Sequence, residues 1–160
     1  MTTNTRCVIA AFTGALALAT VPAAAQTSPV AAPEGSTVLY VPADKVAAAF
    51  VKGQPIVETG SYKVSASRRD RDGQAEVHAR DTDIMYVVEG TATLVTGGQV
   101  VGGTSTAADE VRGDGISGGD SRPLVKGDVI IIPSGVPHLF RDVKAPFLYY
   151  VVKVTAKGGA

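Results

Sequence analysis

The chain has two histidines, His78 and His138, and both lie in segments with the composition of β-strands. In the segment QAEVHARD, the two-residue period of a strand points Glu76, His78 and Arg80 to one face. Imidazoles and carboxylates bind divalent metals, and imidazoles also exchange protons near neutral pH. In an ordinary β-sandwich that face points to solvent, whereas in a barrel that holds a ligand it lines the lumen. The histidines therefore predict a metal site, an acid–base pair, or two packed imidazoles without chemistry.

The backbone around the second histidine is rigid. An apolar strand leads into the turn Pro133-Ser134-Gly135, and Pro137 directly precedes His138. Proline fixes φ and glycine permits tight turns, so such a segment determines where the following side chain points. The sequence thus predicts that His138 is held in a defined direction.

This segment resembles the second motif of the cupin superfamily. That motif is a glycine, five residues, Pro-x-Gly, two residues and a histidine, and the chain has Gly127, Pro133, Gly135 and His138 at that spacing. The first cupin motif, His-x-His, three or four residues, glutamate, six residues and glycine, is similar to HARDTDIMYVVEG. The two motifs together favour a cupin fold.

Within the first motif, the resemblance puts His78 at the first histidine, Asp83 at the glutamate and Gly90 at the end. It implies a double-stranded β-helix (jelly-roll) barrel with His78, Asp83 and His138 as metal ligands. Two imidazoles and one carboxylate suit Fe, Mn, Zn or Ni as a divalent ion. Glu76 is then a substitute ligand or a partner that orients an imidazole.

Arg80 stands where the first cupin motif has its second histidine. A guanidinium cannot ligate a cation and repels one nearby, so the site either holds no metal or Arg80 turns aside. In the second case, Arg80 offers a bidentate clamp for a substrate carboxylate or phosphate. A third alternative is an ion pair with Glu76 or Asp81. The candidate catalytic residues are His78, His138 and Arg80.

The elements that must position these residues are short strands. From Ile56 on, runs of valine, isoleucine and tyrosine alternate with glycine and polar turns, which predicts an all-β sandwich or barrel. Before them, residues 37–41 suit a strand. Residues 45–52 suit a short N-terminal helix that Asp44 caps and Gly53 ends. This helix is the exception in an otherwise β-rich pattern.

One long segment, residues 96–123, has the composition of a loop. It holds 8 of the 18 glycines of the chain and no long apolar run. Glycine adopts positive φ at low cost, and loops of this length in compact domains are often functional. The segment predicts either a lid over a ligand or a decorated hairpin without a ligand role.

The N-terminus predicts export. Residues 1–25 combine Arg6, an apolar stretch and an Ala-x-Ala pattern, as in a cleavable signal peptide, and the apolar stretch is shorter than the roughly 20 residues that span a bilayer. Residues 26–36 then form a flexible leader, and residues 37–160 form one barrel domain. The expected location is the periplasm or the cell exterior, with no membrane contact after cleavage.

Composition limits the partners. With 15 basic and 15 acidic residues interspersed, the chain lacks the positive stripe that nucleic acids require. Two functions remain: a metal-dependent enzyme acting on a small polar or carboxylated metabolite as an isomerase, lyase or oxygenase, or a non-catalytic, metal-free module that binds a sugar or acid. The cupin resemblance also implies a homodimer, with residues 37–41 as a pairing strand.

Overall fold

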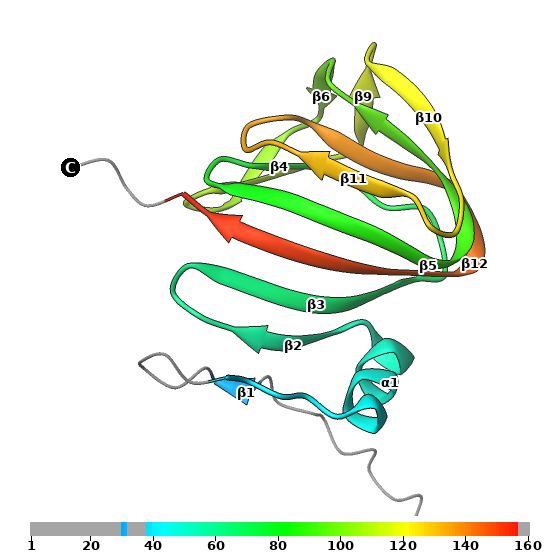
Figure 1. The fold of residues 1–160 in the computed structure, drawn as a ribbon. Coiled ribbons are helices and arrows are strands. Elements are labelled where there is room, and N and C mark those ends of the chain that lie inside the picture. Colours follow the sequence, from blue (N-terminus) through cyan, green and yellow to red (C-terminus); the bar gives the residue numbers. More distant parts are fainter. Residues whose placement is uncertain (1–29, 32–37, 157–160) are drawn as a thin grey trace, which may run out of the picture.

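The structure, a computed structural model, describes residues 30–31 and 38–156 and consists of strands and one short helix (Figure 1). This confirms the predicted all-β class with a short N-terminal helix. In chain order the elements are β1 (Val30–Ala31), α1 (Ala43–Lys52), β2 (Gln54–Glu58), β3 (Tyr62–Arg69), β4 (Ala75–His78), β5 (Asp81–Thr96), β6 (Gln99–Val101), β7 (Thr104–Ala107), β8 (Glu110–Gly113), β9 (Gly115–Ser117), β10 (Asp120–Leu124), β11 (Val129–Ile132) and β12 (His138–Thr155).

Two long strands organise the barrel. β5 has 16 residues and β12 has 18, and they pair antiparallel from His138 opposite Thr96 to Thr155 opposite Asp81. β3 and β4 pair with β12, while β10 and β11 pair with β5. Figure 1 shows β11, β5, β12, β3 and β2 side by side. This is the double-stranded β-helix that the sequence predicts.

Gly90 lies where the long strands depart from regular register. Its φ is 79°, and a Cβ at this position would collide with the carbonyl oxygen of Pro146. On β12, the register shifts between Arg141 and Tyr149, next to Gly90. A glycine is required here because any side chain would meet both the strained φ and the close backbone of β12.

The core is divided into two clusters. The larger one lies inside the barrel and contains three packed aromatic rings, with centroids of Phe140 and Phe147 5.7 Å apart and those of Phe147 and Tyr149 5.2 Å apart. The smaller one lies under α1, where the ring of Phe50 meets Tyr150 edge-on at 5.0 Å. The burial of aromatic surface in both clusters fixes the strands that carry the site.

The helix ends as predicted and begins differently. Gly53 adopts the left-handed conformation, with φ 67°, and caps the C-terminus. The helix begins at Ala43, with Pro42 as its N-cap and no side-chain cap bond, so the prediction that Asp44 caps it is wrong. Asp44 lies instead in the first turn, where its charge favours the helix dipole.

Of the strand expected over residues 37–41, the structure describes residues 38–41, and these form no strand, since residues 38–42 have no regular structure. The alternation is nevertheless real: Leu39 and Val41 pack on the cluster under α1, while Val38 and Tyr40 are 90% and 81% exposed. A strand also needs a neighbour to bond with, and these residues pair with none among the described strands.

The predicted signal peptide, residues 1–25, lies outside the described residues. Of the predicted leader over 26–36, the structure describes Val30–Ala31, which pair in parallel with Val57 and Glu58 of β2. No helix in the described part of the chain has the length and hydropathy needed to cross a membrane.

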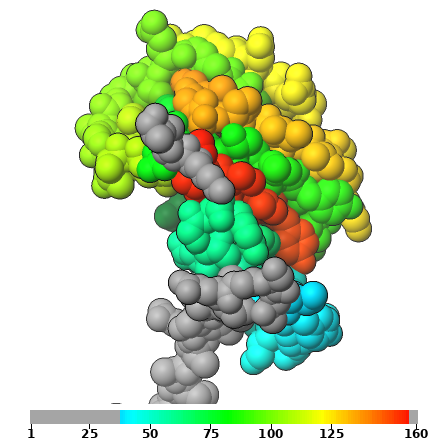
Figure 2. Space-filling view, turned by 60° about the vertical axis from the view of Figure 1, so that its left-hand side comes forward, coloured from blue at the N-terminus to red at the C-terminus, as the bar shows by residue number. Residues whose placement is uncertain are grey.

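The expectation that residues 96–123 are mostly loop is wrong, because this segment folds into five short strands, β6 to β10. Glycines with positive φ at 97, 98, 102, 118 and 119 make the tight turns between them. Figure 2 shows these yellow-green to yellow residues at the end of the molecule opposite α1, which is cyan. The segment is thus a set of hairpins, and its strand β8 pairs with β4.

Candidate metal centre

The structure brings the two histidines together. His138 begins β12 directly opposite Glu76 of β4, and His78 lies two residues further along β4. The turn before His138 is tied to the same strand, because the Gly135 N–H donates to the His78 carbonyl at 2.8 Å. As a result, the imidazole centroids lie 5.1 Å apart, and the two histidines are 4% and 2% exposed.

Both imidazoles present Nε2 to the same point. Nδ1 of His78 lies 2.6 Å from Glu110 Oε1, and Nδ1 of His138 lies 3.1 Å from the Val136 carbonyl. Because a carboxylate and a carbonyl only accept hydrogen bonds, each Nδ1 carries the hydrogen and each Nε2 keeps a free lone pair. Partners of this kind fix the tautomer of metal-binding histidines.

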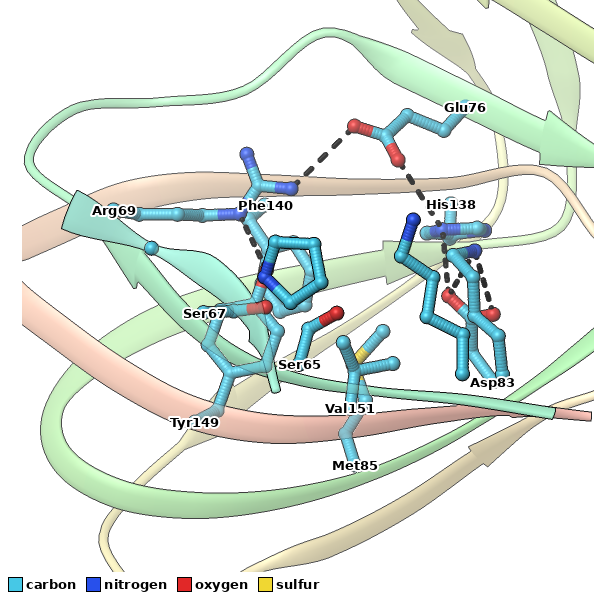
Figure 3. Close-up of a pocket in the computed structure, with 14 residues that line it drawn as sticks. Ser65, Ser67, Arg69, Glu76, Asp83, Met85, His138, Phe140, Tyr149 and Val151 are labelled. Atoms are coloured by element: carbon cyan, nitrogen blue, oxygen red, sulfur yellow. Dashed lines mark hydrogen bonds and ion pairs between the residues drawn. The ribbon is translucent and has the colours of Figure 1, made fainter. Parts of the chain in front are cut away.

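Glu76 completes a group of three. Its Oε2 lies 3.6 Å from His78 Nε2 and 4.0 Å from His138 Nε2, and one ligand atom from each residue falls within 4.8 Å of the others. Figure 3 shows the carboxylate of Glu76 directed at His138. Two imidazoles and one carboxylate are the donor set of a mononuclear divalent metal site.

The charge of Glu76 is maintained by two arginines on its other oxygen. Oε1 contacts Arg112 Nη1 and lies 3.4 Å from Arg69 Nη2. Burial raises the pKa of Glu76, but the positive charges around it, chiefly Arg69 and Arg112, together bring the pKa below its ordinary value. Burial lowers the pKa of His138. The group therefore combines an ionised carboxylate with a neutral imidazole, as metal ligation requires.

Asp83, the carboxylate predicted as a ligand, reaches the same nitrogens. Its Oδ2 lies 3.6 Å from His78 Nε2 and 4.0 Å from His138 Nε2, so the shorter side chain comes as close as Glu76 does. Both of its oxygens, however, accept hydrogen bonds from Lys153 Nζ, at 2.8 and 3.1 Å. The structure thus places Asp83 at the site with a cation already bound to it.

A cavity of about 290 Å³ opens beside these groups (Figure 3). Its walls come from β3, β5 and β12, with β4 and the start of β2 completing it. The lining residues are Gly53, Pro55, Lys63, Ser65, Ser67, Arg69, Glu76, Asp83, Met85, His138, Phe140, Tyr149, Val151 and Lys153. A concave site with a few convergent polar groups is typical of small-molecule binding.

The family of the chain follows from its sequence and this architecture. Residues 43–160 match the cupin family. The chain belongs to the cupin family. The comparison with curated proteins finds no match.

Three solved structures are similar to this chain to different degrees. A protein from Bacillus halodurans is 12% identical with a TM-score of 0.52, and the match covers 75% of this chain and 83% of that one. An uncharacterized protein with a double-stranded β-helix domain from Klebsiella pneumoniae is 18% identical with a TM-score of 0.47, covering 67% and 74%. A DMSP lyase from Ruegeria pomeroyi is 20% identical with a TM-score of 0.44, covering 68% and 45%. At 12% identity, the likeness to the Bacillus halodurans protein concerns the fold alone.

Arg80 does not join the site, although it replaces a cupin motif histidine. β4 ends at His78 and the chain bends at residues 79–80, so the alternation that would align Arg80 with His78 stops. Its side chain is 46% exposed, donates to the Ala156 carbonyl at 2.9 Å and lies 4.0 Å from Asp109. Arg80 therefore neither faces the cavity nor pairs with Glu76 or Asp81.

The sequence reasoning missed four charged residues of this cupin site, and strand pairing explains three of them. Glu110 lies opposite His78 and Arg112 opposite Glu76 in the pairing of β4 with β8, and Lys153 lies opposite Asp83 in the pairing of β5 with β12. The alternating segment EVRG, in a stretch taken for loop, was the available signal for β8. The four residues are Arg69, Glu110, Arg112 and Lys153.

Proposed function

We propose that this cupin binds a divalent metal ion through Glu76, His78 and His138 and acts on a small anionic metabolite in the adjoining cavity. The observation that carries the proposal is Nε2 of His78, which is buried and has no hydrogen-bond partner. A buried polar atom without a partner costs about 1–3 kcal/mol. A cation shared with His138 and Glu76 satisfies that nitrogen.

The donor set suits Fe, Mn, Zn or Ni, which accept imidazole and carboxylate together. A metal bound here would act as a Lewis acid on a carbonyl or enolate oxygen, chemistry that isomerase, lyase and oxygenase reactions use. The residues of the chain do the rest: Glu110 and the Val136 carbonyl orient the imidazoles, and Arg69 and Arg112 keep Glu76 ionised.

The charges of the cavity support an anionic ligand. Three cations line it, Lys63, Arg69 and Lys153, against the carboxylates Glu76 and Asp83. A dication added to this nearly balanced set leaves an excess of positive charge, which a carboxylated ligand neutralises. Hydroxyl groups on β3, at Ser65 and Ser67, also line the cavity and suit polar substituents of such a ligand.

A second candidate function is a metal-free module that binds a small acid without catalysis. It is favoured by one observation: both carboxylates of the site already have cationic partners within the chain, since Arg69 and Arg112 contact Glu76 and Lys153 contacts Asp83. In that case His78 and His138 contribute hydrogen bonds to the ligand in place of a metal.

Elemental analysis of the purified protein separates these two functions. We expect about one equivalent of a divalent metal in the wild type and less than about a tenth of that in His78→Ala and in His138→Ala. Asp109→Asn, which removes an exposed carboxylate outside the cavity, serves as the control and keeps the metal. Sub-stoichiometric metal that both histidine variants retain would overturn the metal proposal and leave the acid-binding module.

We also propose that residues 1–25 direct export and are removed. The support is the charge, apolar stretch and Ala-x-Ala pattern of this segment. Mass spectrometry of the protein recovered outside the cytoplasm should give a chain that begins at Gln26. A chain that retains Met1 and stays in the cytoplasm would contradict this.

A further inference from the structure

Lys153 is the cation that contacts Asp83, the second carboxylate beside the two imidazoles. It lies directly opposite Asp83 in the pairing of β5 with β12, and its ammonium contacts both carboxylate oxygens, at 2.8 and 3.1 Å. The Asp83 side chain is 3% exposed and that of Lys153 is 23% exposed. A buried carboxylate needs a counter-ion, and Lys153 is the one that Asp83 has in the described structure.

The same carboxylate lies within reach of a metal. Its Oδ2 is 3.6 and 4.0 Å from the two imidazole Nε2 atoms, which are the distances that Glu76 Oε2 keeps from them. Glu76 makes its closest contacts with the two arginines through Oε1 and with the two imidazoles through Oε2. Asp83 has no oxygen free of Lys153. The two carboxylates are thus equally near the imidazoles, but Asp83 is bound by Lys153 through both of its oxygens.

We propose that Lys153 sets the metal affinity of this site by competing with the metal ion for Asp83. The inference rests on the proposed metal function, because it assigns the internal ammonium and the metal to the same carboxylate. Glu76 is then the permanent carboxylate ligand, and Asp83 is a conditional one that becomes available when Lys153 is displaced. Removal of Lys153 releases Asp83 and tightens metal binding.

Lys63 provides a matched control. It lies directly opposite Lys153 on β3 and lines the same cavity. Its ammonium lies 3.4 Å from Glu58 on β2, whereas the lysine that pairs with Asp83 is Lys153. If the lysines acted only through the overall charge of the cavity, removal of either one would change the metal affinity alike. If Lys153 competes for Asp83, only its removal raises the affinity. Lys63→Met therefore removes the same charge from the cavity without releasing the carboxylate.

The test is isothermal titration of the metal-stripped protein with Zn²⁺ alone. We expect Lys153→Met to bind Zn²⁺ at least about tenfold more tightly than the wild type, and Lys63→Met to stay within about threefold of it. Lys153→Gln, which keeps a hydrogen-bond donor for Asp83 but no charge, should shift the affinity in the same direction if the Met variant fails to fold. Unchanged or weaker binding by Lys153→Met would overturn the proposal.

A double-mutant cycle with Asp83→Asn separates competition from simple repulsion. If Lys153 competes for Asp83, Lys153→Met raises the Zn²⁺ affinity about tenfold only when Asp83 is present. In the Asp83→Asn background, the same substitution raises the affinity by less than about threefold. An equal gain in both backgrounds means that the ammonium only repels the metal, and it overturns the proposal. If neither the wild type nor any variant binds Zn²⁺, the proposed metal function itself fails.

Discussion

The site has two halves, one on β4 and β8 and the other on β5 and β12, and each presents one carboxylate to the same two imidazole nitrogens. Glu76 and Asp83 lie at equal distances from these nitrogens, and each faces a cation across its strand pair, Arg112 and Lys153 respectively. The halves differ in the oxygens that the cation contacts. Lys153 contacts both oxygens of Asp83, whereas the closest contact of Arg112 with Glu76 is through Oε1. Distance alone therefore does not select a metal ligand; the other contacts of each carboxylate decide it.

Substitution of Glu76 should have the largest effect. Glu76→Gln removes the ionised ligand and leaves Arg69 and Arg112 without their shared carboxylate, so both guanidiniums repel an incoming cation. We expect Zn²⁺ affinity to fall by more than about 100-fold. Asp83→Asn should lower it less, because Lys153 already occupies that carboxylate. Titration calorimetry on both variants checks the order, and a larger loss in Asp83→Asn would reverse the assignment of the two halves.

The orienting carboxylate of the first half comes next. Glu110 accepts the hydrogen of His78 Nδ1 and so directs Nε2 inward. Glu110→Gln should weaken Zn²⁺ binding by about 10–100-fold while the circular dichroism spectrum stays unchanged. Asp109→Asn, at the neighbouring position in the chain, is the matched control and should bind as the wild type does. Equal affinities in the two variants would show that Glu110 does not position the imidazole.

Acid should lower the free energy of unfolding of the metal-free protein through Glu76, the carboxylate of the half on β4 and β8. Burial raises the pKa of Glu76, but the surrounding positive charges, chiefly Arg69 and Arg112, hold its folded-state pKa below the ordinary value of 4.5. As pH falls through 4.5, the unfolded chain takes up this proton first, so stabilisation present above that pH is lost below it. Urea unfolding of the metal-stripped protein should therefore show a steeper loss of the free energy of unfolding from about pH 5 to about pH 3 in the wild type than in Glu76→Gln. Equal losses of the free energy of unfolding in the two proteins would contradict this role of Glu76.

Arg80 belongs to neither half and should have the smallest effect. Its guanidinium is held at the Ala156 carbonyl, outside the cavity. Arg80→Ala should leave metal content and Zn²⁺ affinity within about twofold of the wild type. A tenfold change in either direction would mean that Arg80 turns toward the site in solution.

The local signals in the sequence predicted much of the fold and part of the site. The spacing of Gly127, Pro133, Gly135 and His138 describes a turn whose geometry is local, and the structure ties that turn to His78 by a backbone bond. The helix end at Gly53 likewise follows from one glycine with positive φ. Such features depend on a few consecutive residues, so composition and spacing suffice to predict them.

The remaining residues of the site depend on which strands pair. Glu110 and Arg112 reach β4 only because β8 forms within a glycine-rich stretch, and Lys153 meets Asp83 only through the register of β5 and β12. A period-two pattern tells which face a residue takes but not which strand lies opposite. Arg80 shows the reverse error, since the alternation that placed it beside His78 ends with β4.

The most direct test of the site is anomalous X-ray diffraction from crystals of the protein soaked in Zn²⁺. We expect one strong peak bonded to Nε2 of His78, Nε2 of His138 and Oε2 of Glu76, with metal–ligand distances of about 2.0–2.2 Å. No peak between the two imidazoles, or a zinc ion bound only to surface residues outside the cavity, would contradict the metal centre.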